Sequence, residues 1–251
     1  GSVVKAMASA KNGYPTINKS LQMLARPQIS YEDFLRTVNQ DFAVRVQEIN
    51  ILSDYFIELV VHAPLLARKT KLGHIFRLHN YHSLAKTHSQ TILAMEGVAV
   101  TTYKVNPEAG TITVMIVNVG GSSALARNLK VGEPIIFMGP TGTPTHIFAN
   151  KTVALIAGGR GIFPLAGLAA EYKKNNCKVI FFCGFHKKED LVREEELRNS
   201  CSELILDFSE DVVLAAANYF KNKSEKIDVV LTMGNDAMMH KVAQIYHNEL
   251  K

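Results

Sequence analysis

Short apolar runs separated by turn residues fill the part of the chain from residue 42 to residue 138. Runs of this length, rich in β-branched and aromatic side chains, predict strands. Six such strands in one continuous region indicate a small antiparallel barrel that is closed or partly closed. The predicted strands are Phe42–Ile51, Phe56–His62, His74–Asn80, Val98–Val105, Thr111–Val119 and Pro134–Met138, with one short helix at Ser122–Leu129.

The pattern changes after this region, where apolar runs alternate with amphipathic helical segments. This alternation predicts a doubly wound α/β domain, a parallel sheet with helices on both faces. The strands are expected at Val153–Ala157, Lys178–Cys183, Glu203–Asp207 and Ile227–Thr232, and the helices at Ile162–Lys174, Asp190–Asn199, Asp211–Phe220 and Ala237–Glu249.

The N-terminal segment differs from both regions. A first helix is expected to stop near Gly13 and Pro15, and a second to span Tyr31–Asn39 with Ser30 as its cap. The sequence therefore predicts three parts: a helical extension (1–40), a β-barrel domain (41–148) and an α/β domain (149–251).

Composition limits the class of protein. Of 251 residues, 47% are apolar and 20% charged, which excludes a disordered chain. The apolar runs are too short to cross a membrane, and no signal peptide begins the chain, so a soluble, cytoplasmic protein without membrane contact is expected. The net charge of +5 invites a nucleic-acid partner, but residues 1–40 hold five basic and two acidic side chains, and the remainder is nearly balanced. We expect no nucleic-acid binding.

The thiols and imidazoles carry no recognisable site. Cys177, Cys183 and Cys201 form no C-x-x-C pair, and the first two flank an apolar run, so buried core positions are expected. The nine histidines do not have the spacing of a metal site. No metal and no nucleophilic triad are predicted.

Glycines gather where strands are expected to end. Gly158–Gly161 lie between the first α/β strand and its helix, where glycines let backbone approach a ligand and a helix start offers free N–H groups to a diphosphate. A tight structural turn is the alternative. No acidic residue ends the second strand, where Phe185–Lys188 follows.

Two other turns offer similar chemistry. Gly120–Ser123 enters the short barrel helix with hydroxyls and amides, although a serine that only caps the helix is the alternative. Gly234 and Asn235 follow the last predicted strand, so we expect them to border the same crevice as Gly158–Gly161.

These motifs, in this order, resemble the ferredoxin-reductase-like family, in which an FAD-binding barrel precedes a nicotinamide-dinucleotide domain. The similarity is to the electron-transfer subunit of dihydroorotate dehydrogenase and the small subunit of sulfide dehydrogenase. It is carried by Leu72–Leu78, Glu96–Thr101, Gly120–Ser123, Gly139–Gly142, Gly158–Leu165 and Met233–Met238.

A second resemblance concerns the N-terminus. Val3–Gly13 is similar to the end of a reductase of the glutamate synthase small-subunit type. This implies that the chain is part of a longer polypeptide that fuses such a module to this one.

The family resemblance implies an FAD-dependent NAD(P)H oxidoreductase that passes electrons to another redox domain or subunit. Hydride transfer needs no protein acid or base, so no catalytic residue is assigned. Arg77 either contacts flavin or supports a strand, and Lys187 and Lys188 either meet the 2′-phosphate of NADP or form an exposed loop. The implied cofactor-binding residues are Arg77, Ala99, Val100, Thr101, Gly120, Gly121, Ser122, Ser123, Gly158, Gly159, Arg160, Gly161, Gly234, Asn235 and Asp236.

The sequence departs from the family at three positions. Gly97 stands where the family has an arginine that pairs with the FAD diphosphate, Met233 replaces a cysteine that faces the nicotinamide, and Asn235 replaces a proline. The iron-sulfur cysteines of the dihydroorotate dehydrogenase subunit are not found. A regulatory or assembly module with weak or lost flavin binding is therefore the alternative function.

Overall fold

The computed structural model describes residues 2–24, 29–209, 211–223 and 226–249. It divides into two compact units, Gly1–Asn39 and Gln40–Lys251. The larger unit has a barrel lobe (β1 to β8) and an α/β lobe (β9 to α8). Whether these lobes are separate domains with a boundary near residue 149 stays a prediction.

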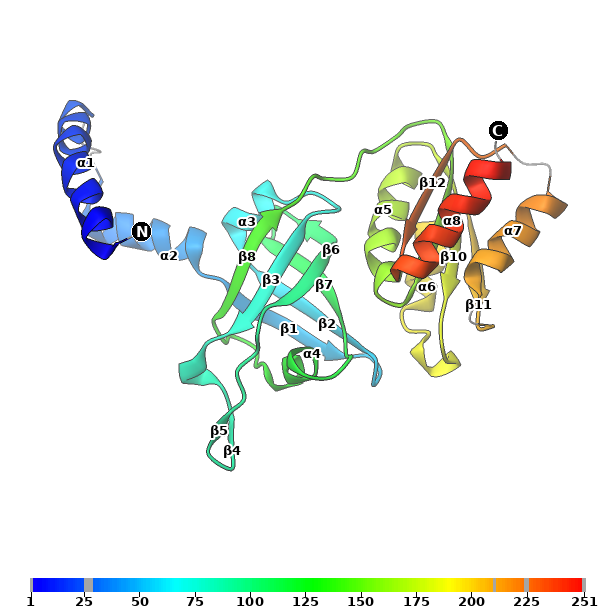
Figure 1. The fold of residues 1–251 in the computed structure, drawn as a ribbon, viewed down its shortest axis with the longest axis horizontal. Coiled ribbons are helices and arrows are strands. Elements are labelled where there is room, and N and C mark those ends of the chain that lie inside the picture. Colours follow the sequence, from blue (N-terminus) through cyan, green and yellow to red (C-terminus); the bar gives the residue numbers. More distant parts are fainter. Residues whose placement is uncertain (1, 25–28, 210, 224–225, 250–251) are drawn as a thin grey trace. The chain divides into compact units, whose positions relative to one another are not determined.

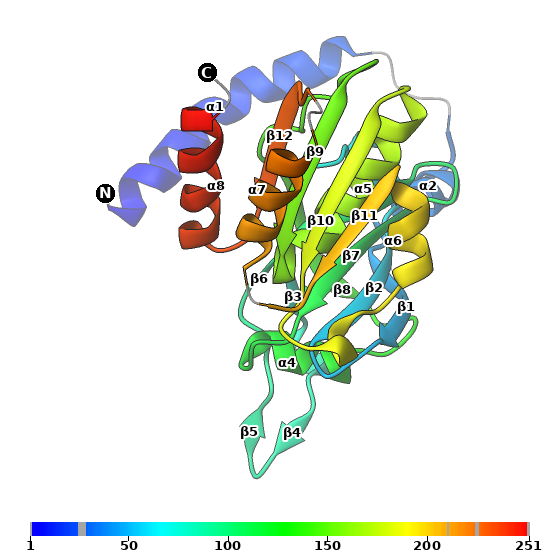
Figure 2. The same ribbon diagram turned by 90° about the vertical axis from the view of Figure 1, so that its right-hand side faces the viewer.

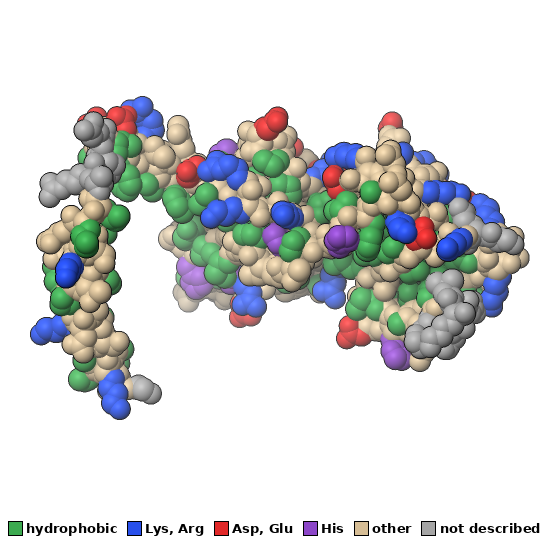
Figure 3. Space-filling view, turned by 90° about the horizontal axis from the view of Figure 1, so that it is seen from above, with side chains coloured by type: hydrophobic (Ala, Val, Ile, Leu, Met, Phe, Trp, Pro, Cys, Tyr) green, Lys and Arg blue, Asp and Glu red, His purple; other side chains and the backbone are tan. Residues whose placement is uncertain are grey.

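Two helices begin the chain. Helix α1 spans Val3–Met23, so the prediction that it stops near Gly13 and Pro15 is wrong. Proline removes one backbone hydrogen bond, but its fixed φ is compatible with a helix, so the helix continues through it. None of the α1 side chains is buried, and apolar ones lie uncovered on its surface (Figure 3).

Helix α2 spans Tyr31–Phe42 and begins as predicted. The Ser30 Oγ accepts a hydrogen bond from the Asp33 amide at 3.0 Å and donates one to the Asp33 carboxylate at 2.8 Å. This reciprocal cap satisfies an amide that has no partner inside the helix.

The barrel lobe contains one six-stranded antiparallel sheet in the order β1-β2-β7-β6-β3-β8 (Figure 1). A bridge between Arg45 and Pro134 and a 3.0 Å bond from the Val46 amide to the Glu133 carbonyl join the two edge strands. The predicted partly closed antiparallel barrel is confirmed. The strands are β1 (Arg45–Ile51), β2 (Phe56–His62), β3 (Ile75–Asn80), β6 (Val98–Asn106), β7 (Thr111–Val117) and β8 (Ile135–Thr141).

The connections of the barrel hold elements that the apolar pattern did not predict. They are too short, or too polar, to produce a periodic signal. The predicted helix Ser122–Leu129 is present as a short α-helix followed by a 3₁₀ turn. The connecting elements are α3 (Pro64–Lys69), the hairpin β4 (Thr87–His88) and β5 (Thr91–Ile92), α4 (Ser122–Leu125), and the 3₁₀ turns η1 (His82–Leu84) and η2 (Ala126–Asn128).

The α/β lobe has a four-stranded parallel sheet in the order β11-β10-β9-β12 (Figure 2). The chain winds outward from β9 through β10 to β11 and then returns to place β12 on the other side of β9. The strands are β9 (Thr152–Gly158), β10 (Lys178–Gly184), β11 (Glu203–Asp207) and β12 (Val229–Met233).

Helices cover both faces of this sheet, as predicted. Alternate strand residues point to opposite faces: Leu155 packs with α5 and α6, whereas Ile156 packs with α7 and α8. The helices are α5 (Ile162–Lys174), α6 (Glu194–Ser200), α7 (Val212–Asn222) and α8 (Asp236–Glu249), with 3₁₀ turns η3 (Gly159–Gly161) and η4 (Lys188–Asp190).

One hydrophobic cluster contains residues of both lobes. Phe163 of α5 makes edge-on ring contacts with Phe56 and Tyr103 of the barrel, at centroid distances of 5.2 and 5.3 Å. A Cβ added to Gly167 would lie 2.1 Å from the Tyr103 carbonyl oxygen, so helix and strand backbones approach closely there. Helix α5 is therefore the main contact between the lobes.

Of the described helices, none has both the length and the apolar character that crossing a membrane requires.

Candidate functional site

The first glycine turn follows β9, the strand at which the sheet reverses its winding direction. In open α/β sheets, ligands bind at the carboxyl ends of strands beside such a reversal. Gly158 ends β9, Gly159 adopts a positive φ of +50°, and the η3 turn leads directly into α5. The turn therefore lies where the sequence placed it, between a strand end and a helix start.

Gly161 has a packing role in this turn. It is buried, and a Cβ there would lie 2.0 Å from the carbonyl oxygen of Met233, the last residue of β12. Any side chain would force backbone apart. Gly161 thus lets the start of α5 lie against β12, and it does not line the cavity described next.

A cavity of about 420 Å³ opens at these strand ends. Both glycine turns of the α/β lobe border it, as the sequence predicted. Five predicted residues line it, namely Gly158, Gly159, Arg160, Gly234 and Asn235, whereas Gly161 and Asp236 are not in its lining.

The barrel lobe also contributes to this cavity, through Tyr55 and Val119. A Cβ on Gly159 would lie 3.0 Å from the Tyr55 hydroxyl, so this ring stands directly over the first glycine turn. Burial raises the pKa of Tyr55 above its usual range, and the nearby Arg160 opposes the shift. The hydroxyl therefore stays protonated and available as a donor at neutral pH.

A further glycine turn lies in the barrel lobe, immediately after Val119. Gly120 and Gly121 have φ values of +88° and +54°, which L side chains rarely adopt. A Cβ on either residue would meet nothing within 4 Å. Glycine is needed here for backbone conformation, and the space in front of the turn is open to a ligand.

Both serine hydroxyls of this turn are bonded to the protein. The Ser123 Oγ donates to the Gly120 carbonyl at 2.7 Å and accepts from the Val119 amide at 3.0 Å. The Ser122 Oγ accepts from the Glu96 amide at 2.9 Å. The turn therefore offers a ligand backbone groups and open space, while the hydroxyls hold its shape.

Hydrogen bonds tie this turn to the loop between β1 and β2. The Asn118 amide donates to the Tyr55 carbonyl at 2.8 Å, and the Asn118 side chain donates to the Asp54 carbonyl at 3.0 Å. Arg127 of η2 donates to the same carbonyl at 2.8 Å. These bonds hold Tyr55 and Val119 beside each other at the rim of the cavity.

The predicted strand residues lie on β3 and β6. Arg77 pairs in register with Ala99, and both are exposed, while Thr101 is half-buried opposite Ile75. Val100 belongs to the barrel core and is 3% exposed, so its side chain faces away from any ligand outside the barrel. These residues do not line the 420 Å³ cavity.

The far end of the cavity carries charge. Asp211 caps α7 by accepting from the Leu214 amide at 3.1 Å and forms a 2.6 Å ion pair with Lys241 of α8. The hydrogen bond from Lys241 and that from the Leu214 amide lower the pKa of Asp211. Lys187 and Lys188 are exposed and do not line the cavity.

Sequence reasoning missed several lining residues. Asp211 and Lys241 lie on the last two helices, and only the fold brings them to the end of β10. Tyr55 carries no motif, because its position depends on the hydrogen-bonded loop that holds it. Phe185 and His186 follow β10 directly and also line the cavity, but no motif marks them as lining residues.

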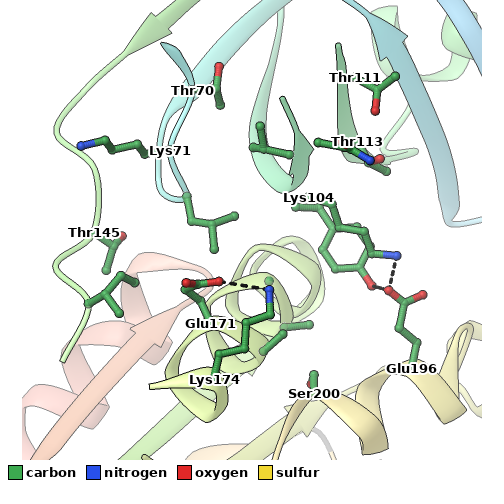
Figure 4. A pocket seen from close by; sticks show the side chains of 18 of the residues that line it. Thr70, Lys71, Lys104, Thr111, Thr113, Thr145, Glu171, Lys174, Glu196 and Ser200 are labelled. Atoms are coloured by element: carbon green, nitrogen blue, oxygen red, sulfur yellow. Dashed lines mark hydrogen bonds and ion pairs between the residues drawn. The ribbon is translucent and has the colours of Figure 1, made fainter. Parts of the chain in front are cut away.

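A second, larger cavity of about 950 Å³ is lined by residues of α5, α6 and β6, among others (Figure 4). Tyr103 donates a hydrogen bond to Glu196 of α6, and Lys104 forms an ion pair with the same carboxylate. Burial alone raises the pKa of Glu196, but hydrogen bonds from Lys104 and Tyr103 bring it below its usual value. The sequence did not predict this cavity.

An ion pair between a buried carboxylate and a partly exposed arginine joins the lobes near that network. Glu58 of β2 is 5% exposed and accepts a 2.6 Å bond from Arg193, the residue that precedes α6. The Asn50 side chain donates to the same Glu58 oxygen at 3.0 Å. The cation and the amide together compensate one oxygen of this buried carboxylate, Oε2.

The cysteines are buried, as predicted. Burial raises the pKa of Cys201 to about 11 and that of Cys183 well above its usual range, so neither thiol is a nucleophile at neutral pH. Across the described part of the chain, no group of three His, Cys, Asp or Glu residues is placed to hold a metal ion.

No protein-family model matches the chain. An uncharacterized protein of Rickettsia prowazekii (strain Madrid E) is 37% identical over 182 residues, which is 72% of this chain and 24% of that protein. The electron transfer subunit of dihydroorotate dehydrogenase B (NAD(+)) from Fusobacterium nucleatum subsp. nucleatum is 31% identical over 90 residues, 35% of each chain. The chain thus spans about a quarter and about a third of these two relatives.

Among solved structures, that of NADH-dependent reduced ferredoxin-NADP oxidoreductase, studied for flavin-based electron bifurcation, matches with a TM-score of 0.70. It is 18% identical, and the match covers 82% of this chain and 72% of that one. The chain has the ferredoxin reductase-like fold. The expected resemblance is confirmed for this fold and for the dihydroorotate dehydrogenase electron transfer subunits, which are its homologues. The resemblance to a glutamate synthase fusion stays a prediction.

Proposed function

We propose that this ferredoxin reductase-like chain is an electron-transfer module that binds FAD and NAD(P)H and passes electrons to another redox domain or subunit. One observation carries the proposal: the glycine turn of the α/β lobe and the residue next to the glycine turn of the barrel border one cavity of about 420 Å³. A pocket of this size suits part of a dinucleotide.

The residues fit two nucleotide cofactors. Gly158, Gly159 and Arg160 would receive the diphosphate of the nicotinamide dinucleotide at the start of α5, where backbone amides and a cation favour negative charge. Gly120 and Gly121 would receive the FAD diphosphate, since their positive φ values leave the front of the turn open.

Bound flavin would supply the chemistry, because it accepts a hydride equivalent from a nicotinamide and releases electrons one at a time. The contribution of the chain is positioning. Tyr55 closes the cavity from the barrel side, over Gly159, and Lys241 balances the charge of Asp211 at the far end. No side chain is required to move a proton in this step.

The names of the homologues favour electron transfer over the alternative, a regulatory or assembly module without flavin. The substrate, the final acceptor and the choice between NADH and NADPH are those of the whole protein. The absence of the usual arginine at Gly97 does not by itself exclude FAD.

The test is direct. Purified protein is mixed with FAD, dialysed, and examined for bound flavin absorbance; the loaded protein is then titrated anaerobically with NADH and with NADPH. We expect stoichiometric flavin and bleaching by at least one nucleotide. Folded protein that stays colourless and gives no calorimetric heat with FAD would contradict the proposal.

The matched control is a variant of the nucleotide cavity that leaves the barrel turn intact. In Asn235→Ala, the loss of the bond from the Met238 amide to the Asn235 side chain, 2.8 Å in the native chain, should loosen the turn after β12. We expect unchanged flavin content and slower bleaching. Equal loss of both properties would indicate general unfolding.

A further inference from the structure

Arg77 lies across Gly97, the residue that precedes the neighbouring strand β6. A Cβ added to Gly97 would lie 2.5 Å from the Cδ and 2.6 Å from the Cγ of Arg77. Since real Cβ atoms do not make contacts this short, the aliphatic stem of Arg77 occupies the space that a side chain at position 97 would need. The glycine and the arginine therefore depend on each other.

This crossing point is close to the glycine turn of the barrel. Glu96, the residue before Gly97, donates its amide to the Ser122 Oγ at 2.9 Å. Ser122 follows Gly120 and Gly121 directly. The stem of Arg77 thus passes one residue from the bond that fastens the strand to the turn proposed for the FAD diphosphate.

The charge of Arg77 is available. The side chain is exposed, and within the described residues no hydrogen bond or ion pair joins its guanidinium to another group. His79, two residues along β3, has a buried Nε2 without a hydrogen-bond partner in the described part of the chain, and this atom also lies 2.9 Å from the position of a Gly97 Cβ. The outer face around Gly97 therefore holds a free cation and an unsatisfied polar atom.

We infer that Arg77, from strand β3, supplies the positive charge for the diphosphate of bound FAD. The inference rests on the proposed function. It accounts for the departure at Gly97: in the observed conformation the Arg77 stem and the His79 ring occupy the space of a side chain at that position, and the chain carries the cation on β3. Arg77 is then a binding residue with the strand role as a secondary one.

The chemistry predicts a selective effect. A guanidinium donates two parallel hydrogen bonds to phosphate oxygens, and charge-assisted bonds of this kind are stronger than neutral ones. Riboflavin has the same ring and ribityl chain but no phosphate. Loss of the Arg77 charge should therefore weaken FAD and leave riboflavin unaffected.

The experiment measures dissociation constants for FAD and for riboflavin by flavin fluorescence in the wild type, Arg77→Gln and Arg77→Lys. Glutamine keeps much of the stem over Gly97 and removes the charge, whereas lysine keeps the charge without the planar fork. We expect Arg77→Gln to weaken FAD about tenfold or more, Arg77→Lys to weaken it less, and riboflavin binding to change less than about twofold. The salt dependence of FAD binding should fall in Arg77→Gln only.

A matched control removes one positive charge elsewhere. Arg198 on α6 is exposed and pairs with Glu194 at 2.6 Å, so Arg198→Gln should leave FAD affinity unchanged. The triple variant Arg77→Ala, His79→Ala, Gly97→Arg moves the cation to the residue before β6, with both side chains that occupy the space at position 97 shortened. We expect it to recover most of the FAD affinity that Arg77→Ala loses.

The outcomes are separable. A wild-type chain that binds FAD together with an Arg77→Gln variant of equal FAD affinity overturns the inference and leaves the proposed function intact. A folded wild-type chain that binds no FAD overturns both. Equal weakening of FAD and riboflavin assigns Arg77 to the strand alone and also overturns the inference.

Discussion

The two glycine turns look alike in sequence and differ in structure. In the α/β lobe, Gly161 is buried and a side chain would strike the Met233 backbone, so packing demands the glycine. In the barrel, Gly120 and Gly121 face open space, and backbone conformation demands them. A glycine motif therefore signals a ligand most directly where the added Cβ meets nothing.

The largest effect should come from weakening the contact between the two lobes that carry the turns. Arg193→Ala would leave the Glu58 carboxylate buried without its cation, because that side chain lies in the barrel wall with 5% exposure. We expect a loss of about 3 kcal/mol in unfolding free energy, measured by urea titration.

Its control is Arg198→Ala, which breaks an exposed pair on α6 and should cost less than about 0.5 kcal/mol. A double variant with Glu58→Gln should recover part of the loss, since the buried charge is then gone. Equal stability of Arg193→Ala and Arg198→Ala would show that the ion pair does not hold the lobes together.

Gly161→Ala tests the turn of the α/β lobe, where neighbouring backbone fills the space that a side chain would need. Its Cβ would lie 2.0 Å from a backbone oxygen, so α5 and β12 must move apart. We expect about 2 kcal/mol of destabilisation in thermal or urea unfolding. Unchanged stability would mean that the close approach of Gly161 to β12 is not required by the fold.

Gly121→Ala tests the turn of the barrel lobe, where the space around the glycine is open. We expect it to lower the free energy of unfolding less than Gly161→Ala does. Its φ of +54° is unfavourable for alanine, at about 1 kcal/mol or more, but no atom obstructs the methyl group. We expect a larger relative loss of FAD affinity than of stability, measured by flavin fluorescence and urea unfolding together. If the two turns do not differ in this way, their comparison fails.

The smallest effect concerns pH. Because the pKa of Glu196 is lower in the folded state, its stabilisation is present above the pKa of the unfolded chain and is lost as pH falls through the folded value. Glu196→Gln should thus be less stable than the wild type by less than about 1 kcal/mol at pH 7, and the difference should vanish as the pH falls from 7 through the folded pKa of Glu196. A constant difference over this pH range would exclude the charged network as its source.

Much of the fold could be read from the sequence because its elements are strongly periodic. The strand Phe56–His62 and the helix Ile162–Lys174 have the predicted bounds. The end of the first helix could not be predicted, because Pro15 is a helix breaker by propensity while its fixed φ is compatible with the helix that continues through it. Local propensity is weak evidence for where a solvent-exposed helix ends.

The candidate site could be predicted only in part from the sequence. Glycines at strand ends are local signals, and they lie where the sequence placed them. The approach of Tyr55 to Gly159 and of Arg77 to Gly97 depends on loop bonding and strand register, which no local pattern encodes. The same is true of the larger cavity, whose wall includes Tyr103, Glu171 and Glu196 from three separate elements.

Helix α5 has a consequence for distance. Its N-cap is Gly161, and it meets the β6 backbone at Gly167, six residues later, which along a helix is about 9 Å. The rise of helix α5 thus sets the distance between the nucleotide turn and the barrel wall. This distance does not depend on the covalent connection between β8 and β9. Residues inserted into that connection would lengthen the chain but would leave the distance between the nucleotide turn and the barrel wall unchanged.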